Sequence, residues 1–301
     1  METLKPPALK KGDTIGVIST SCWLEKSDLL SAQDFLKQNG YDAFHHPQAL
    51  ARLNQSAGSA QEKITAFHEL FADPDIKMIM GARGGNRAIT MLDKIDFDLI
   101  RQNPKILIGY SDMTTLLNGV YAKCGLVTFH GPLYRELPTH KNFQDMIDMV
   151  SGKTDRIDLP GSELLKPGAT EGKLFGGNLS LFQTLIGTDL LPDLDGAILF
   201  LEDVADHLSR YDRMFGHLRI SGLLHKISGL IVGQFTETKD SEERPFGFTL
   251  KDIVEEHTAG LDIPVLFNAP FGHGEDLPTF PVGCRARLDS EGLTLLESPV
   301  S

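Results

Sequence analysis

The segment Lys105–Leu116 reads KILIGYSDMTTL and combines a strand signal with a helix signal. Its apolar run ends at Gly109 and predicts a buried strand, and the residues after Ser111 have a helical pattern. The serine at this joint has two interpretations. Either Ser111 or the next residue caps the helix, or Ser111 is a nucleophile presented at a sharp strand-to-helix turn. The motif G-x-S-x-G of such turns is not met, because Met113 occupies the position of the last glycine.

Outward from this segment, the first half of the chain alternates short apolar runs with helical patterns. The capping-box sequence SAQE at 59–62 starts one of these helices, and Pro74 closes it. Strands separated by helices predict a mostly parallel sheet flanked by helices. The expected strands are Thr14–Ser19, Ile76–Met80, Lys105–Gly109 and Val127–Phe129. Ligands of such sheets bind beyond the carboxyl ends of the strands. The glycine-rich loop Gly81–Arg87 (GARGGNR) and the GYSD turn are therefore expected at the ligand edge.

The pattern changes after about residue 140. Prolines and glycines in Asp158–Thr170 indicate a connecting segment, and further strand-like runs follow at 197–201, 229–235 and 265–268. The expected fold class is α/β, with a smaller β-rich domain after the parallel sheet. We expect an α/β N-terminal domain at 1–150, a linker at 151–170 and the β-rich C-terminal domain at 171–301.

Composition excludes several classes of function. The formal net charge is −12 over 301 residues, and no run of lysine or arginine forms a basic patch, so we expect no nucleic-acid partner. No stretch approaches the roughly 20 apolar residues needed to span a bilayer, so we expect no membrane association. The N-terminus lacks the apolar core of a secretory signal. Three widely spaced cysteines fit neither a disulfide framework nor a zinc site. A cytoplasmic location and three buried thiols are expected.

Three residues together suggest nucleophilic catalysis, which needs a nucleophile, a base and a group that orients the base. His273 lies in the loop APFGHGEDLP after a strand, and Glu202 follows the strong apolar run AILFL. Each has an alternative interpretation: His273 as a solvated loop residue, and Glu202 as the partner of Arg210 or Arg213. With Ser111 they give the chain order Ser, Glu, His of α/β-hydrolases. No H-E-x-x-H motif supports a metal site.

Longer segments carry a family resemblance over nearly the whole chain. They are GARGGNRA, PKILIGYSDMTTLL, TFHGP, LFGGNLSLFQTLIGT, LFLEDV, RYDRMFGHL, GLIVGQFT and PFGHGEDLPTFPVG. On these segments the chain resembles the LD-carboxypeptidases, serine peptidase family S66.

The resemblance implies a catalytic set spread over both domains. It implies that Ser111 is the nucleophile, His273 the general base and Glu202 the residue that orients His273. Backbone N–H groups of Asp112 and Gly85 would form the oxyanion hole. It further implies a homodimer with no metal and no organic cofactor. The expected substrate is a murein tetrapeptide, whose terminal D-alanine is released by cleavage after an L-configured centre, in peptidoglycan recycling.

One loop departs from the family pattern, and this leaves the substrate preference open. The family loop reads R-G-G-Y-G, whereas Asn86 and Arg87 replace its aromatic residue and last glycine. Arg83 in the same loop is a candidate for binding the substrate carboxylate, because a guanidinium bonds carboxylates bidentately. A structural ion pair is the alternative for Arg83. Two other functions stay open: hydrolysis of antibiotic peptide–nucleotide conjugates, and binding of murein peptides without catalysis.

Overall fold

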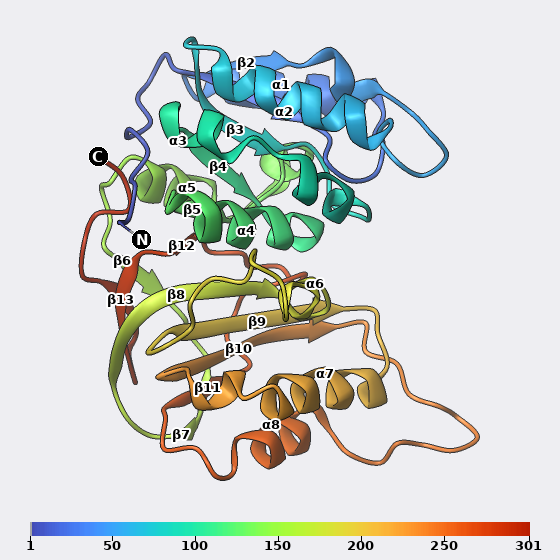
Figure 1. The fold of residues 1–301 in the computed structure, drawn as a ribbon, viewed down its shortest axis with the longest axis vertical. Coiled ribbons are helices and arrows are strands. Elements are labelled where there is room, and N and C mark those ends of the chain that lie inside the picture. The colour runs from blue at the N-terminus through green and yellow to red at the C-terminus, as the bar shows by residue number, and fades with distance from the viewer. Residues whose placement is uncertain (1) are drawn as a thin grey trace.

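Residues 2–301 are described by a computed structural model that contains two β-sheets (Figure 1). The first sheet has six strands in the order β12-β5-β4-β3-β1-β2. Five of them are parallel, and β12 pairs antiparallel with β5. The strands are β1 (Thr14–Ile18), β2 (Asp42–His45), β3 (Ile76–Gly81), β4 (Ile106–Gly109), β5 (Thr128–His130) and β12 (Phe280–Val282). The central strands are buried along almost their whole length, which explains their uninterrupted apolar sequences.

Helices flank this sheet, as the alternating pattern predicts. They are α1 (Lys26–Gln38), α2 (Ala60–Ala72), α3 (Phe97–Gln102), α4 (Thr114–Cys124) and α5 (Phe143–Val150), with 3₁₀ helices η1 (Pro47–Leu50), η2 (Ala88–Lys94), η3 (Ser111–Met113) and η4 (Tyr134–Thr139). The predicted capping box is confirmed, because the Ser59 hydroxyl accepts from the Glu62 amide and the Glu62 carboxylate accepts from the Ser59 amide. The α-helix expected directly after Ser111 begins three residues later, since one 3₁₀ turn comes first.

The second sheet has eight strands in the order β6-β14-β13-β8-β9-β10-β11-β7. The strands are β6 (Arg156–Asp158), β7 (Glu163–Lys166), β8 (Thr170–Asn178), β9 (Ile198–Val204), β10 (Gly229–Thr236), β11 (Val265–Phe267), β13 (Arg285–Asp289) and β14 (Gly292–Leu295). Its four central strands, β8 to β11, are parallel, and the outer strands are antiparallel. The connections between the parallel strands contain α6 (Leu179–Phe182), η5 (Gln183–Leu185), α7 (Leu208–Ile220), η6 (Leu223–His225) and α8 (Leu250–Thr258).

The predicted fold class is therefore confirmed, with two additions. The segment 151–170, expected as a linker, contributes the short outer strands β6 and β7 to the second sheet. Strand β12 belongs to the second half of the chain, yet it completes the first sheet. The domain boundaries at residues 150 and 171 stay a prediction.

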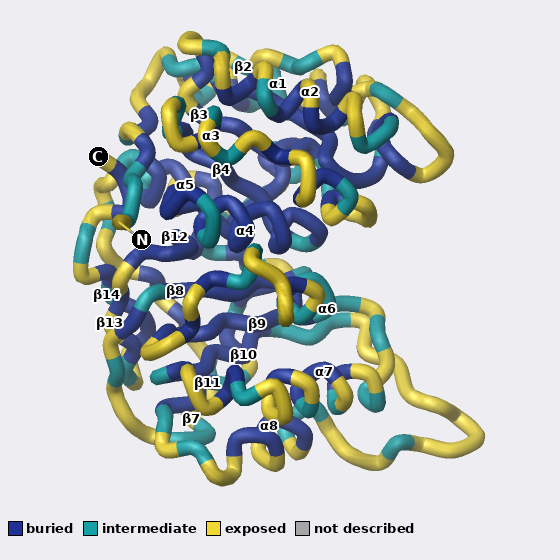
Figure 2. The backbone as a smooth tube through the Cα atoms, viewed as in Figure 1, coloured by how far each residue is buried: buried dark blue, intermediate teal, exposed yellow. Residues whose placement is uncertain are grey.

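Helix α4 fixes the two sheets relative to each other. It lies between them and is buried along nearly its whole length (Figures 1 and 2). The side-chain amide of Asn118 donates to the Gly176 carbonyl of β8 at 2.8 Å. The Thr114 hydroxyl accepts from the backbone N–H of Asn178 at 3.0 Å. Asn178 in turn lies opposite Glu202 in the adjacent strand β9. The helix that follows Ser111 is thus tied to the strand beside Glu202.

The remaining interior is continuous across both sheets, and one apolar cluster extends through them. No helix within residues 2–301 is long and apolar enough to span a membrane.

Candidate active site

Ser111 occupies a strained turn at the carboxyl end of β4. Its φ is +60°, in the left-handed region that a non-glycine residue enters at a cost of about 1–3 kcal/mol. The turn is tight because the Met113 sulfur packs against Gly81 and Gly109, at the ends of β3 and β4. A Cβ on either glycine would lie only 2.1 or 2.4 Å from that sulfur. The Met113 side chain, which stands where the motif has its last glycine, thus fits because the two strand ends carry glycines.

The glycine-rich loop covers this turn. A Cβ added at Gly84 would lie 3.3 Å from the Ser111 Oγ, and Gly85 has a φ of +130° and presses against the buried Cys22. The Arg83 Nη1 donates to the Trp23 carbonyl at 2.9 Å. The hydrogen bond found for Arg83 is therefore to a backbone carbonyl and is not the structural ion pair that the sequence left open as an alternative to substrate binding.

Asp112 caps a helix, but a different one from the helix that the sequence suggests. Its carboxylate is buried and accepts from the Ala88 amide at 2.8 Å, at the start of η2. Burial raises the pKa of Asp112, and hydrogen bonds from Ser21 and Ala88 and the charge of Lys63 oppose that rise. Asp112 thereby ties the Ser111 turn to the end of the glycine-rich loop.

Glu202 and His273 form a hydrogen-bonded pair. The Nδ1 atom of His273 lies 2.7 Å from the Oε2 atom of Glu202, whose side chain is fully buried. The apolar run AILFL predicts a strand that ends before Glu202, but β9 continues to Val204, so the carboxylate is held inside the sheet. The alternative pairing with Arg210 or Arg213 is not found among the described residues, where Glu202 pairs with His273 and Arg210 pairs with Asp206 at 3.4 Å.

The pair favours a charged imidazole. Burial lowers the pKa of His273, but the hydrogen bond and negative charge of Glu202 outweigh burial and raise the pKa above its ordinary value. Burial raises the pKa of Glu202, and the bond from His273 opposes that rise. An imidazole oriented by a buried carboxylate is suited to accept a proton on its other nitrogen.

A cavity of about 180 Å³ brings most of the expected residues together. Its lining includes Ser111, His273, Gly85 and Arg83. Glu202 lies behind His273, and Asp112 lies behind Ser111, so neither side chain lines the cavity. In the described part of the chain, no hydrogen bond joins Ser111 to His273. The distance between a nucleophile and its base is commonly long in a free enzyme and shortens when substrate binds.

Gly84 of the glycine-rich loop also lines this cavity, and the four remaining lining residues were missed in the sequence: Tyr110, Leu133, Arg135 and Glu136. Tyr110 directly precedes Ser111 in the GYSD turn, and this adjacency was the available signal. The other three belong to β5–η4 and η4 itself, and they approach the site through tertiary packing that has no local pattern.

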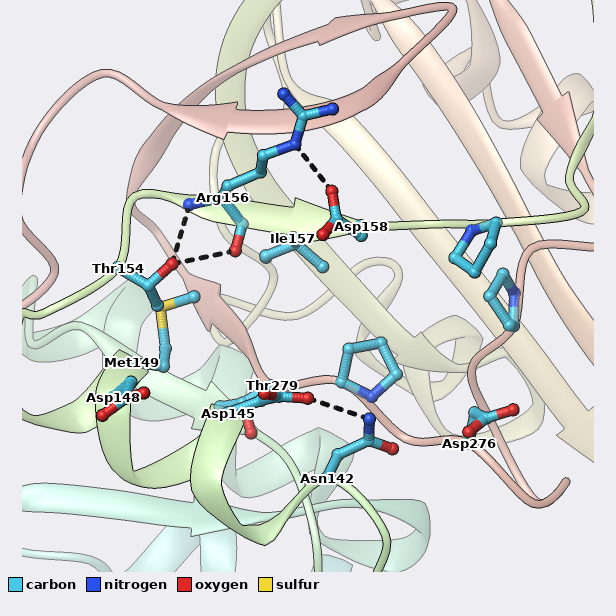
Figure 3. A pocket seen from close by; sticks show the side chains of 13 residues that line it. Asn142, Asp145, Asp148, Met149, Thr154, Arg156, Ile157, Asp158, Asp276 and Thr279 are labelled. Carbon is cyan, nitrogen blue, oxygen red and sulfur yellow. Dashed lines mark hydrogen bonds and ion pairs between the residues drawn. The ribbon is translucent and has the colours of Figure 1, made fainter.

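A larger cavity of about 320 Å³ lies between α5, β6 and the segment 270–279 (Figure 3). Arg156 pairs with Asp158 at 2.6 Å, and Asn142 donates to Asp145 at 3.0 Å. Neither a serine nor a histidine is among the described residues that line it. The smaller cavity therefore combines a hydroxyl with an imidazole, as nucleophilic catalysis requires, and the larger one does not.

Metal-binding geometry is absent from residues 2–301, where no group of three or more histidine, cysteine or carboxylate side chains is arranged around one point. The three cysteines Cys22, Cys124 and Cys284 are free and buried, as expected.

Comparison with known proteins places this chain in a class of peptidases. Residues 15–131 match the model of the LD-carboxypeptidase N-terminal domain, and residues 171–288 match that of the C-terminal domain. The chain belongs to the LD-carboxypeptidase family, peptidase family S66.

Individual relatives are similar over their full length. A probable murein peptide carboxypeptidase of Bacillus subtilis is 32% identical, with 99% of this chain and 95% of the relative covered. The crystal structure of a muramoyltetrapeptide carboxypeptidase from Oxalobacter formigenes has a TM-score of 0.85 and 30% identity, covering 95% of this chain and 100% of that one. The structure of MccF in complex with glutamyl sulfamoyl guanosine has a TM-score of 0.90 and 25% identity, covering 99% and 100%.

Proposed function

We propose that this protein is a serine carboxypeptidase that releases the terminal D-alanine of murein tetrapeptide by hydrolysing an L,D peptide bond. The observation that carries this proposal is the cavity lined both by Ser111, at a strained turn, and by His273, which is hydrogen-bonded to Glu202. The names of the relatives, which include two murein peptide carboxypeptidases, supply the substrate class.

Each proposed step assigns one task to a residue of the cavity. The Ser111 oxygen forms a bond to the scissile carbonyl carbon while its proton passes to His273. N–H groups of Asp112 and Gly85 stabilise the oxyanion. The carbon–nitrogen bond then breaks, and His273 gives its proton to the leaving amine of D-alanine. Water, deprotonated by His273, hydrolyses the acyl-enzyme and restores the Ser111 hydroxyl.

Arg83 is our candidate for the free carboxylate of the substrate. It lines the cavity, and its bond to the Trp23 carbonyl uses one nitrogen of a guanidinium that has several donors. That bond holds the arginine in position and leaves donors for a bidentate carboxylate contact.

Hydrolysis of peptide–nucleotide conjugates is the second candidate, because MccF, the microcin C7 self-immunity protein, is similar over 93% of this chain. Such a ligand needs aromatic surface for its base. The single tryptophan, Trp23, has the guanidinium of Arg52 lying 3.4 Å from its ring centroid, which covers one face of the ring. This contact favours the murein substrate.

Mass analysis of products tests the proposal. Wild-type protein is incubated separately with murein tetrapeptide and with an aminoacyl sulfamoyl nucleotide. We expect loss of one alanine from the tetrapeptide, and we expect the Ser111→Ala variant to lose this activity. Cleavage of the nucleotide conjugate alone would support the MccF-like alternative. Tetrapeptide binding without cleavage would indicate a binding protein, and an active Ser111→Ala variant would refute the assigned nucleophile.

The proposed setting is a cytoplasmic homodimer. The three free, buried cysteines are consistent with the cytoplasmic part of this setting. Light scattering of the purified protein tests the dimer, and fractionation of the cells that produce it tests the compartment.

A further inference from the structure

His273 touches a second group besides Glu202. The ring of Tyr110 packs on the imidazole with a centroid distance of 4.9 Å and an interplanar angle of 50°. Glu202 holds one ring nitrogen of the histidine at 2.7 Å, whereas Tyr110 limits the tilt of its plane. The imidazole is therefore contacted from two segments far apart in the sequence, at Nδ1 by Glu202 and on the ring by Tyr110.

Tyr110 is itself held by a carboxylate from outside the expected catalytic set. Its hydroxyl donates to the Oε1 atom of Glu136 at 3.2 Å. The Oε2 atom of Glu136 accepts from the Leu133 amide at 3.2 Å, which fixes the carboxylate at the first turn of η4. Both oxygens of Glu136 thus have a donor, and Glu136 also lines the cavity with His273.

The charge of this carboxylate acts on His273 directly. Glu202 and Asp203 on β9 and Glu136 on η4 favour the imidazolium, and the nearby His130 on β5 opposes it when charged. Arg135 on η4 has a positive charge beside Glu136 and Tyr110. Burial raises the pKa of Glu136, and the bonds from Leu133 and Tyr110 oppose that rise and favour the ionised form.

We propose that Glu136 is a positioning residue of the catalytic centre, which holds the imidazole of His273 through Tyr110 and stabilises its protonated form. The proposal rests on His273 being the general base of the proposed function. It adds to Glu202 a second carboxylate, which lines the same cavity as His273 and is contributed by the first half of the chain.

The direction of the expected effect follows from the sign of the charge. A carboxylate near an imidazole raises its pKa, so its removal lowers that pKa. Because a general base works only when neutral, the acidic limb of the kcat/KM profile moves to lower pH in Glu136→Gln. A shift of roughly half to one pH unit is expected when one partly buried charge near the imidazole is lost.

The test measures the titration of His273 by NMR in the Ser111→Ala background, and the pH profile of kcat/KM in the active background. Glu136→Gln is compared with Glu275→Gln, a matched loss of charge two residues from His273. The side chain of Glu275 is 82% exposed and pairs with Lys141. We expect Glu136→Gln to lower the pKa of His273 and the acidic limb together, and the Glu275 variant to leave both in place.

The proposal would be overturned if the pKa of His273 were the same in the Glu136→Gln variant as in the protein with Glu136 in place. It would also be overturned if Glu275→Gln shifted that pKa by the same amount. The NMR measurement needs no catalysis, so it separates this proposal from the proposed function, whose failure appears as an active Ser111→Ala protein. If Glu136→Gln does not fold, Tyr110→Phe tests the same contact. It keeps the ring but removes the donor to Glu136, and a smaller shift in the same direction is expected.

Discussion

The Oε2 atom of Glu202 lies 2.7 Å from the Nδ1 atom of His273, at the end of a side chain with no exposed surface. This contact fixes which nitrogen of the imidazole faces the cavity. It also couples a strand of the second sheet to the loop that carries the proposed general base.

Glu202→Gln tests this contact. The amide has the shape of the carboxylate but no charge, and its NH₂ group opposes the tautomer needed for catalysis. We expect kcat to fall on the order of 10⁴-fold, as for the equivalent change in other triads, with a small effect on KM. Tetrapeptide kinetics give the values, and a thermal melt verifies folding. A kcat close to that of the wild type would remove Glu202 from the catalytic set.

Arg83→Ala tests carboxylate recognition. The guanidinium lines the cavity, so its loss is expected to abolish the preference for a free C-terminal carboxylate over a C-terminal amide. The measurement is D-alanine or D-alaninamide release from the matched pair of peptides. Arg87→Ala is the control, because Arg87 is in the same loop but is exposed and outside the lining. A free-acid preference that persists in Arg83→Ala would exclude this arginine.

Two neighbouring glycines are expected to respond differently to alanine. At Gly84 the new methyl group would lie 3.3 Å from the Ser111 Oγ and 3.4 Å from Leu133, so turnover falls while the melting temperature changes little. At Gly85 the methyl group meets the Cys22 sulfur at 2.3 Å and the φ of +130° is strained, so stability also falls, by about 1–3 kcal/mol. Turnover and urea unfolding, measured for both variants, provide the comparison. Equal loss of stability in both would contradict it.

His130 is expected to make the fold sensitive to acid. It is fully buried among aromatic rings and its two ring nitrogens have no partner among the described residues; burial lowers its pKa to about 3. The contribution of neutral His130 to the free energy of unfolding is complete above pH 6.5 and is lost as the pH falls towards 3. The reason is that the folded state resists a protonation that the unfolded chain accepts. The slope is about 1.4 kcal/mol per pH unit.

Urea unfolding between pH 7 and pH 4.5 measures this slope. His130→Phe, which keeps an aromatic ring in the cluster, is expected to flatten the acid side of the stability profile. His225→Gln, at an exposed position, is the control. A slope unchanged by His130→Phe would assign the acid sensitivity to other groups.

Much of the fold was predictable because its central strands are buried on both faces. β1, β3, β4, β9 and β10 therefore appear as apolar runs, and the helices between them have clear start and stop signals. Strand β12 was missed because it has three residues, one of them Pro281, and exists only through its pairing with β5. Outer strands β6 and β7 were hidden in the segment taken as a linker, since proline and glycine surround them.

The site was predictable where its residues follow a strand along the chain. Ser111, Arg83 and Gly85 come directly after β4 and β3, so the topology alone places them at one edge. Glu136 has no such signal, because it reaches His273 through Tyr110 from a 3₁₀ helix that lies well beyond Ser111 in the sequence. The strain at Ser111 was also invisible, since it depends on Met113 packing between two glycines of adjacent strands.

The pairing of β12 with β5 has a mechanical consequence for the enzyme. The segment that carries His273 leaves β11 in one sheet and enters β12 in the other, so its two ends are clamped to different sheets. Any hinge motion between the sheets must pull on this segment and move the imidazole. The two halves are also expected to melt as one unit, because separating them requires breaking the strand that closes the first sheet.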